Sequence, residues 1–347
     1  MTILRLTPAT ATHRGMRRKH NEDAVGYEYP ADIDRLQSYG ALFIVADGVG
    51  GLSSGDKASQ MTVKHLIKHY YASDASLDRE QALIRAIQVV NSDVFSELNQ
   101  TGATTLVAAL IIHDNLIIAS AGDSQIFHIA DDRIKQLNEE DVLQSDDADN
   151  GALTKAIGYR EAIEIETTRI PLQANDKILL CSDGLTRYLD ESQLAQLTNL
   201  RDPRDSVRNM INRANTSGGA DNISAIVIHV GGAIEAGDIA THIKQIPVRV
   251  AVDTDPMMMQ DVPSKPTTQI PMSRPQTVID ESLLGTPEIP QAKPKEAVTP
   301  QPALASRAEQ QPEPAQSSNG IIVIIVAAVI ILVIGAVIFG MALSALP

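Results

Sequence analysis

The stretch that decides the fold is an apolar run followed by an acid and a group of glycines, Leu42-Phe43-Ile44-Val45-Ala46-Asp47-Gly48-Val49-Gly50-Gly51. The apolar residues have the length and character of a buried strand. The glycines after them indicate a turn, because glycine accepts positive φ angles and lets the backbone approach a ligand closely. The sequence therefore predicts that Asp47 lies at a strand's edge.

Two further acids stand in similar surroundings. Lys177-Ile178-Leu179-Leu180-Cys181-Ser182 leads into Asp183-Gly184, and the glycine-rich turn Ser217-Gly218-Gly219-Ala220-Asp221-Asn222 precedes the apolar run of residues 223–230. Each site alone is more typical of a hairpin turn, since Asp-Gly is a common turn dipeptide. Three strand-edge acids together favour a shared cation, and oxygen ligands without cysteine or histidine suit Mg²⁺ or Mn²⁺ better than zinc.

The 347-residue chain is acidic, with 43 Asp and Glu against 29 Lys and Arg and a formal net charge of -14. This balance argues against nucleic acid or an anionic membrane surface as the main partner. Cys181 is the chain's one cysteine, which excludes an intrachain disulfide framework. The first residues contain no sustained apolar segment, so we expect no cleavable signal peptide.

Between residue 4 and about residue 230 the pattern predicts a mixed domain of short strands and helices. The expected strands cover residues 41–46, 105–112, 116–121, 125–129, 163–170, 178–181 and 223–230. The expected helices cover residues 54–71, 78–98, 190–198 and 203–215. Because neighbouring strands are joined by hairpin-type turns and the helices come in pairs, we expect antiparallel sheets covered by helices rather than a doubly wound array.

The composition changes near Ala233. Residues 237–319 carry thirteen of the eighteen prolines and no Phe, Tyr or Trp, so we predict a disordered linker over residues 233–319. Residues 321–343 form a charge-free apolar run of about 23 residues, long enough for a transmembrane helix that contacts membrane lipid. Basic residues precede this run, which predicts a single-pass protein of the cytoplasmic (inner) membrane with its folded domain in the cytoplasm.

Near the N-terminus, Arg18-Lys19-His20-Asn21-Glu22-Asp23 combines basic residues with two adjacent carboxylates. Alone it is typical of an exposed charged turn. Together with Asp47-Gly48 it supplies what two-metal phosphoryl hydrolysis requires, namely acids that bind the ions and a planar guanidinium that binds a phosphate. Two small-residue turns lie further along, Gly102-Ala103-Thr104-Thr105 and Gly122-Asp123-Ser124, and the second carries another strand-edge acid.

These motifs, in this order, resemble those of the metal-dependent type 2C serine/threonine protein phosphatases in their bacterial form. The likeness rests on Arg18-x-x-Asn21-Glu22-Asp23, Val45-Ala46-Asp47-Gly48-Val49-Gly50-Gly51, Gly102-Ala103-Thr104-Thr105, Gly122-Asp123-Ser124, Ser182-Asp183-Gly184 and Asp221-Asn222. It implies a catalytic domain over residues 4–232 with an α+β fold. That fold is a four-layer α-β-β-α sandwich of two antiparallel sheets flanked by helix pairs, with a metal cleft at one end.

The resemblance also implies a role for each matching residue. Asp47 would bridge two Mn²⁺ or Mg²⁺ ions. Asp183 and Asp221 would complete the ligands of the first ion. The Gly48 carbonyl and Glu22 would be ligands of the second. Asp23 would lie behind these ligands, Arg18 would bind the phosphate, Asp123 with Asp183 would form a third, weaker metal site, and Asn222 would orient its neighbouring ligand.

Such a centre hydrolyses phosphoserine and phosphothreonine in proteins without a covalent intermediate, because paired ions lower the pKa of a shared water and provide a bridging hydroxide near neutral pH. The expected partners are proteins phosphorylated on Ser or Thr, namely a cognate Ser/Thr kinase or the substrates of that kinase. Two departures from the family stand out. Val49 replaces a histidine that many eukaryotic members carry, and the flap around residues 141–153 is short and acidic, which puts substrate preference in doubt.

Two rival interpretations remain. Cys181 and Arg187 satisfy the Cys-x5-Arg spacing of cysteine-based tyrosine phosphatases, although Asp183 between them would repel a phosphate. Alternatively, the chain is a catalytically weak phosphatase-like scaffold that binds a kinase or a membrane complex. His65 and His69 lie four apart on one predicted helix, have no apparent third ligand and stay unassigned.

Overall fold

The computed structural model describes residues 3–50, 52–131, 133–143, 152–234 and 249–251. These residues belong to one compact unit, Met1–Thr267. Most of the expected linker and the whole expected transmembrane helix, residues 321–343, lie outside the described residues. Within the described ranges, no helix combines the length and the apolar character that crossing a bilayer requires.

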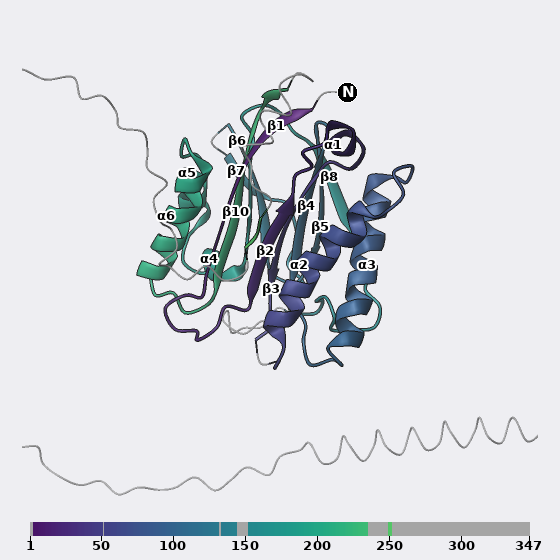
Figure 1. Ribbon diagram of the computed structural model, residues 1–347. Coiled ribbons are helices and arrows are strands. Elements are labelled where there is room, and N and C mark those ends of the chain that lie inside the picture. Colours follow the sequence, from purple (N-terminus) through teal and green to yellow (C-terminus); the bar gives the residue numbers. More distant parts are fainter. Residues whose placement is uncertain (1–2, 51, 132, 144–151, 235–248, 252–347) are drawn as a thin grey trace, which may run out of the picture. The chain divides into compact units, whose positions relative to one another are not determined.

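Two antiparallel sheets form the centre of the fold (Figure 1). In the described part of the chain the first sheet has the strand order β1-β10-β9-β6-β7 and the second the order β11-β2-β3-β4-β5-β8. The first sheet contains β1 (Leu4–His13), β6 (Gln125–Ala130), β7 (Arg133–Gln136), β9 (Lys177–Cys181) and β10 (Ile223–Ala233). The second contains β2 (Asp23–Glu28), β3 (Ala41–Asp47), β4 (Leu106–Ile112), β5 (Asn115–Ala121), β8 (Thr167–Pro171) and β11 (Arg249–Ala251).

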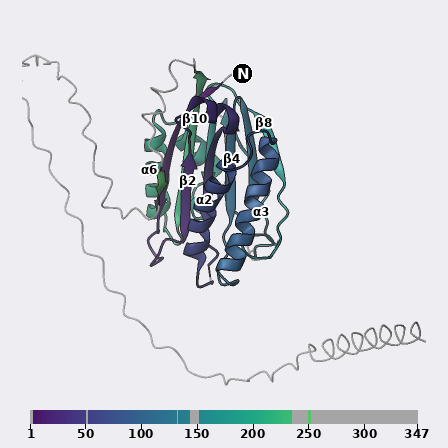
Figure 2. The same ribbon diagram turned by 45° about the vertical axis from the view of Figure 1, so that its right-hand side comes forward.

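Helices cover the outer face of each sheet. The helices α2 (Gly55–Tyr71) and α3 (Arg79–Glu97) pack on the second sheet. The helices α4 (Asp183–Thr186), α5 (Glu191–Thr198) and α6 (Pro203–Thr216) pack on the first, and the short α1 (Ile33–Tyr39) joins β2 to β3. Figures 1 and 2 show the layers from two sides. The expected α+β fold with two antiparallel sheets and helices is confirmed.

The central strands β3 and β4 are buried on both faces, which explains why their sequences are continuously apolar rather than alternating. In β3, Phe43 and Val45 face the other sheet, where they join the core between the two sheets. Leu42 and Ile44 face α2 and α3 and belong to the core under these helices. The apolar stretch of residues 42–45 therefore contributes alternate side chains to two cores.

The helix starts follow from local sequence. Asp78 accepts hydrogen bonds from the backbone N–H groups of Glu80 and Gln81 and begins α3. Asp190 and Gln193 form a reciprocal capping box that begins α5. These side chains satisfy N–H groups that a helix start leaves without partners.

The structure adds two long strands that the sequence patterns do not single out, β1 and β2. β1 contains Pro8 and several threonines, and β2 contains Gly26, so neither has the apolar run of a typical buried strand. β1 pairs along almost its whole length with β10, and β2 pairs with β3. Tertiary pairing thus overrides weak local propensity. The strand expected over residues 163–170 is wrong in its first half, because β8 begins at Thr167.

Candidate active site

Four aspartates converge at one end of the sandwich. Asp47 ends β3, Asp123 lies in the turn between β5 and β6, Asp183 begins α4 directly after β9, and Asp221 precedes β10. All four line one cavity of about 120 Å³. The other lining residues are Arg18, Gly48, Val49, Gly50, Thr105 and Leu153. The strand-edge acids of the sequence thus share one space, as a shared cation requires.

Threonines at the start of β4 hold the backbone of Asp47 in place. Its N–H donates to Thr105 Oγ1 at 2.9 Å, and its carbonyl accepts a hydrogen bond from Thr104 Oγ1 at 2.8 Å. The backbone N–H of Thr105 also donates to the Asp47 carbonyl, at 2.8 Å. Asp47 therefore has a fixed backbone, and its side chain is directed by the end of a strand rather than by a loose loop.

Asp23 lies behind the cavity and not in its lining. It begins β2 directly opposite Asp47 in the strand register and is only 3% exposed. Ser182 Oγ, from the other sheet, donates to Asp23 Oδ2 at 2.8 Å. Burial raises the pKa of the Asp23 carboxyl to about 7. Asp23 thus connects the two sheets immediately beneath the residue expected to bridge two metals.

Arg18 and Glu22 lie on the loop between β1 and β2 at the cavity's rim. Arg18 Nη2 is 2.8 Å from Asp221 Oδ2, and Arg18 Nη1 is 3.8 Å from Glu22 Oε2. The Arg18 side chain is 42% exposed, so an incoming anion can reach its guanidinium. Burial raises the pKa of Glu22, and the nearby Arg18 opposes that shift. Glu22 itself does not line the cavity within the described residues.

Asn222 holds this loop against the first sheet. It is 2% exposed, and its Nδ2 donates to the carbonyls of Arg14 and His20, both at 2.9 Å. Its Oδ1 accepts a hydrogen bond from the backbone N–H of Glu22 at 2.8 Å. The side-chain amide therefore holds the rim loop, while the backbone N–H of Asn222 donates to Asp221 Oδ1 at 2.8 Å, so Asn222 is a positioning residue for both.

Two glycines allow backbone segments to pack closely beside the acids. A Cβ at Gly48 would lie 2.5 Å from the Gly55 carbonyl oxygen, and a Cβ at Gly184 would lie 1.9 Å from the Asn222 carbonyl oxygen. Both distances are far below van der Waals contact, so any side chain would separate the segments. The Asp-Gly pairs of the sequence are thus required by packing, not by a hairpin turn.

The cavity's electrostatics indicate cations. Burial, and then the charges of Asp23, Asp183 and the other acids, raise the pKa of Asp47 well above its ordinary value. Burial and the neighbouring Asp183 raise the pKa of Asp123 to about 6. The pKa of Asp183 is also raised, by burial and then by Asp221. Divalent cations would relieve this repulsion, and an all-oxygen donor set fits Mg²⁺ or Mn²⁺.

Comparison with known proteins identifies the family. A family profile described as Protein phosphatase 2C matches residues 13–227, which include all four cavity aspartates. The chain belongs to the protein phosphatase 2C family. Among its relatives, the serine/threonine phosphatase stp of Listeria innocua serovar 6a is 34% identical over 240 residues, covering 62% of this chain and 93% of the relative. The serine/threonine protein phosphatase PstP of Mycobacterium tuberculosis is 26% identical over 241 residues, covering 64% and 44%.

Solved structures agree with this assignment. PppA of Pseudomonas aeruginosa, described as a key regulatory component of T6SS, is 27% identical with a TM-score of 0.57 and covers 66% of this chain and 100% of its own. The catalytic domain of the phosphatase PstP in complex with two manganese ions is 26% identical with a TM-score of 0.56, covering 66% and 99%. This chain is therefore a metal-dependent protein-serine/threonine phosphatase of the bacterial protein phosphatase 2C type.

Buried hydroxyls are the site residues of this phosphatase that sequence reasoning did not assign. Thr105 Oγ1 lies 2.7 Å from Ser124 Oγ, and the backbone N–H of Ser224 donates to Ser182 Oγ at 3.0 Å. Thr12 Oγ1 lies 2.8 Å from Ser224 Oγ. The signal was present, because polar residues beside buried strand runs need partners inside the fold. Their partners, however, are 19, 42 and 212 residues away along the chain.

The cysteine interpretation is wrong for this phosphatase. Cys181 lies within β9 and is fully buried. Burial and the neighbouring Asp183 raise the pKa of the thiol far above its ordinary value, so the side chain is not the thiolate that such a mechanism needs.

The structure describes only part of the short acidic flap expected around residues 141–153. At its start, Asp141 Oδ1 forms an ion pair with Lys155 Nζ at 3.0 Å. Residues 144–151 lie outside the described residues.

Proposed function

We propose that the acidic cavity is where this phosphatase hydrolyses phosphoserine and phosphothreonine in proteins, with two Mn²⁺ or Mg²⁺ ions held by its carboxylates. Asp47, Asp183 and Asp221 would hold the first ion, and Asp47, Glu22 and the Gly48 carbonyl would hold the second. Asp123 and Asp183 would hold a third, weaker ion. The observation that carries the proposal is the convergence of four aspartates from distant segments on one cavity that also contains Arg18.

Two such ions, when bound, supply a water of lowered pKa as the nucleophile and neutralise phosphoryl charge. The chain's own residues bind the phosphoryl group and hold the acids in position. Arg18 lies at the rim, where its planar guanidinium binds the phosphoryl oxygens and stabilises the charge that grows on them. Its contact with Asp221 holds it in that position before the substrate arrives. The hydrogen bond from the Asp47 N–H to Thr105 Oγ1 and the one from Thr104 Oγ1 to the Asp47 carbonyl keep Asp47 from moving when charge redistributes.

No side chain in the cavity acts as a covalent nucleophile in this scheme. Val49 occupies the place where many eukaryotic members carry a histidine, so this chain has no imidazole there to protonate the leaving alkoxide. The raised pKa of Asp123, about 6, leaves that carboxyl partly protonated near neutral pH in the absence of cations. The positive charge of bound ions would favour the ionised form of Asp123, and that carboxylate would then be able to hold an ion.

A phosphothreonine peptide assay on the full chain tests the proposal. We expect turnover that needs Mn²⁺ or Mg²⁺ and stops with EDTA, and we expect Asp183→Asn to abolish it because the substitution removes a ligand charge with little change of volume. Asp205→Asn is the matched control, since this acid lies on α6 and pairs with Arg208. Turnover that survives EDTA, or an active Asp183→Asn variant, would refute the cation centre.

The apolar run of residues 321–343 supports a second part of the proposal, a membrane anchor that keeps the catalytic domain on the cytoplasmic side. The run is charge-free and long enough to span a bilayer, and the basic residues lie before it. The linker would let the domain reach phosphorylated proteins near the membrane, a Ser/Thr kinase included. The full chain should stay with membranes after alkaline extraction, and a chain ending before residue 321 should not; equal behaviour of the two would contradict the anchor.

A further inference from the structure

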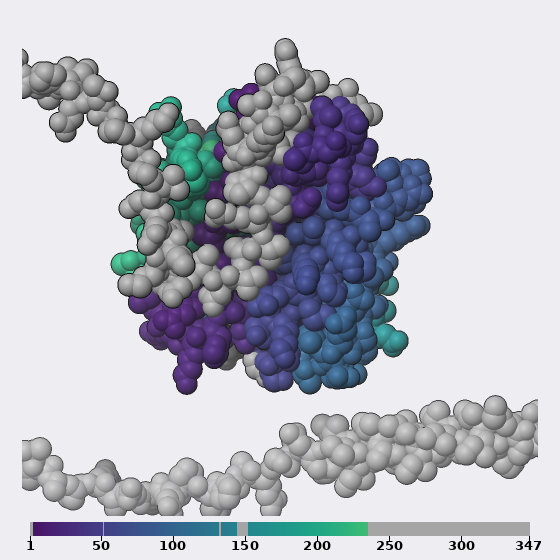
Figure 3. Space-filling view, in the orientation of Figure 1, coloured from purple at the N-terminus to yellow at the C-terminus, as the bar shows by residue number. Residues whose placement is uncertain are grey.

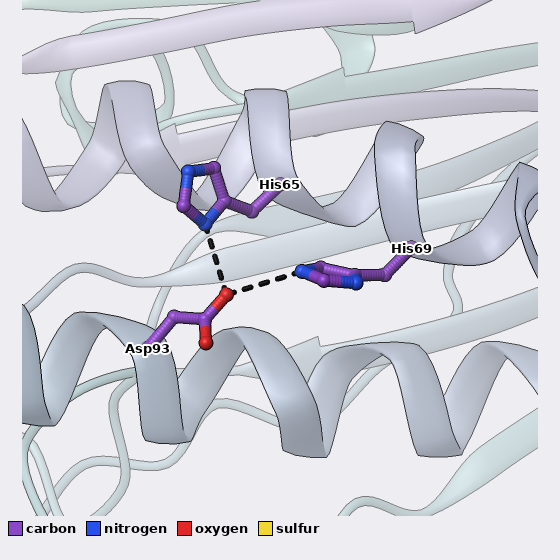
Figure 4. A group of neighbouring side chains, drawn as sticks. All are labelled: His65, His69 and Asp93. Atoms are coloured by element: carbon purple, nitrogen blue, oxygen red, sulfur yellow. Dashed lines mark hydrogen bonds and ion pairs between the residues drawn. The ribbon is translucent and has the colours of Figure 1, made fainter.

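A second cluster of metal-ligand side chains lies on the outer helix layer. It consists of His65 and His69 on α2 and Asp93 on α3, and is called here the helix-pair cluster. His65 Nδ1 lies 3.0 Å from Asp93 Oδ2, and His69 Nε2 lies 3.1 Å from the same oxygen. Figure 4 shows both imidazoles directed at that one oxygen from the facing helix. The third ligand that the sequence alone did not reveal is therefore Asp93.

The cluster's geometry follows from helix periodicity. Residues four apart project from the same helix face, so His65 and His69 point in one direction. One ligand atom from each of the three residues lies within 4.8 Å of the other two. A tetrahedral ion about 2.0–2.2 Å from each donor holds the donors roughly 3.4 Å apart. The distances of 3.0 and 3.1 Å from the two imidazole nitrogens to Asp93 Oδ2 are close to that separation. The three atoms can thus contact a single ion with small side-chain rotations.

The cluster is accessible and chemically distinct from the cavity. The side chains of His65, His69 and Asp93 are 21%, 29% and 30% exposed, so an ion could enter from solvent and keep a water ligand. Figure 3 shows the α2 and α3 region, in blue, at the molecular surface. Within the described residues, the ion pairs of Asp93 are with these two imidazoles and not with a lysine or arginine. In the part of the chain that the structure describes, no fixed cation therefore competes for its carboxylate.

We propose that the helix-pair cluster binds a divalent transition-metal ion of the zinc class, which links α2 to α3. Two imidazole nitrogens and one carboxylate oxygen are typical Zn²⁺ ligands, whereas Mg²⁺ prefers oxygen donors throughout. The site has three protein ligands and an open position for water. The proposal is independent of the catalytic assignment, because it uses none of the cavity residues.

A bound ion here would act on the helix layer that borders the active site. The N-terminus of α2 packs against Gly48, and Ser59 Oγ donates to the Glu22 carbonyl. His65 follows about 9 Å further along the same helix. Linking α2 to α3 at this point stabilises the folded state by mass action, since the unfolded chain does not bring the three ligands together.

The test measures Zn²⁺ binding to the full chain in four forms, namely wild type, the double variant His65→Gln/His69→Gln, Asp93→Asn, and Lys64→Gln as a control on the exposed side of α2. After chelation and dialysis, wild type and Lys64→Gln should bind one Zn²⁺ per chain more than the other two. Zn²⁺ at about 100 times its Kd should raise their Tm by roughly 5–10 °C, and the cluster variants should lack this part of the shift.

Two further readouts separate the cluster from the catalytic cavity. With Co²⁺ in place of Zn²⁺, wild type should show the visible absorption band of Co²⁺ bound by nitrogen ligands at a low coordination number. The double variant should lack this band. Mn²⁺-dependent turnover should stay within about twofold in the cluster variants, which shows that they are folded. Equal Zn²⁺ stoichiometry and equal Tm shifts in wild type and both cluster variants would overturn the proposal. If the double variant loses turnover, the Zn²⁺ stoichiometry and the Tm shift of Asp93→Asn, which preserves side-chain volume, decide whether the cluster binds the ion.

Discussion

The acidic cavity and the helix-pair cluster are built in opposite ways. The cavity collects aspartates from positions 47, 123, 183 and 221, which only the packing of two sheets brings together. The helix-pair cluster takes two ligands from adjacent turns of α2 and one from the next helix along the chain. The cavity offers oxygen donors alone, whereas the cluster offers mostly nitrogen. One domain thus presents one donor set that suits a hard cation and another that suits a borderline cation.

The two regions also differ in their dependence on ions. The cavity acids are desolvated and repel one another, which is why the pKa values of Asp47, Asp123 and Asp183 are raised. The cluster is partly exposed and contains one carboxylate, so it has no second carboxylate whose repulsion an ion would relieve. Without ions, the cavity is a source of instability and the cluster is not.

The largest effect should come from replacing one acid in each region by asparagine. Asp47→Asn should lower Mn²⁺-dependent turnover by about 10²–10³-fold or more, because it removes charge from the position proposed to hold both ions. Asp93→Asn, an identical chemical change on α3, should leave turnover within about twofold. Steady-state kinetics on a phosphothreonine peptide measure both. Similar losses in the two variants would mean that the regions are not functionally separate.

Arg18→Ala should have the next largest effect, a loss of about 10–100-fold in kcat/KM, because the phosphate loses its guanidinium partner. Arg18→Lys should recover only part of it, since an ammonium group cannot bind two oxygens in a planar fork. Arg204→Ala, at an exposed position on α6 paired with Asp202, is the control. An unchanged kcat/KM in Arg18→Ala would remove this residue from phosphate binding.

The stability of the metal-free protein should fall as pH rises from about 4 to about 7. The pKa of Asp123 is raised to about 6 and that of Asp23 to about 7, so the folded protein binds more protons than the unfolded chain in this window. Ionisation on the way up therefore favours unfolding. Tm measured with EDTA across this range should decline in wild type and decline less in Asp47→Asn. A Tm that rises steadily with pH would contradict the raised pKa values of the buried carboxyl groups around the cavity.

Thr105→Val should give a smaller but measurable loss, because the Asp47 N–H loses its side-chain acceptor while the volume of the residue is nearly kept. We expect a destabilisation of about 1–3 kcal/mol from the unpaired buried donor. Turnover should fall by about tenfold as the Asp47 backbone shifts. Thr105→Ser retains the hydroxyl and should restore most of both. Equal behaviour of the two variants would show that the hydroxyl does not position Asp47.

Much of the fold was predictable because its signals are local. The apolar runs of β3, β4 and β9 and the amphipathic patterns of α2 and α3 predict those elements closely, since each is buried as its own sequence requires. β1 and β2 were not predictable in this way. Their residues become strand only because β10 and β3 offer edges for pairing, which no local window contains.

The sequence by itself determined which residues are candidates for the chemistry, since an acid that ends a buried strand beside glycines is a local feature with a local cause. The motifs around Asp47, Asp183 and Asp221 were readable for this reason. Only the tertiary structure decided which residues meet. It placed Asp23 opposite Asp47, brought Ser182 to Asp23, and supplied Asp93 to the two histidines. Contacts between segments far apart in the chain depend on how sheets and helices pack together, and that information is distributed over the whole domain.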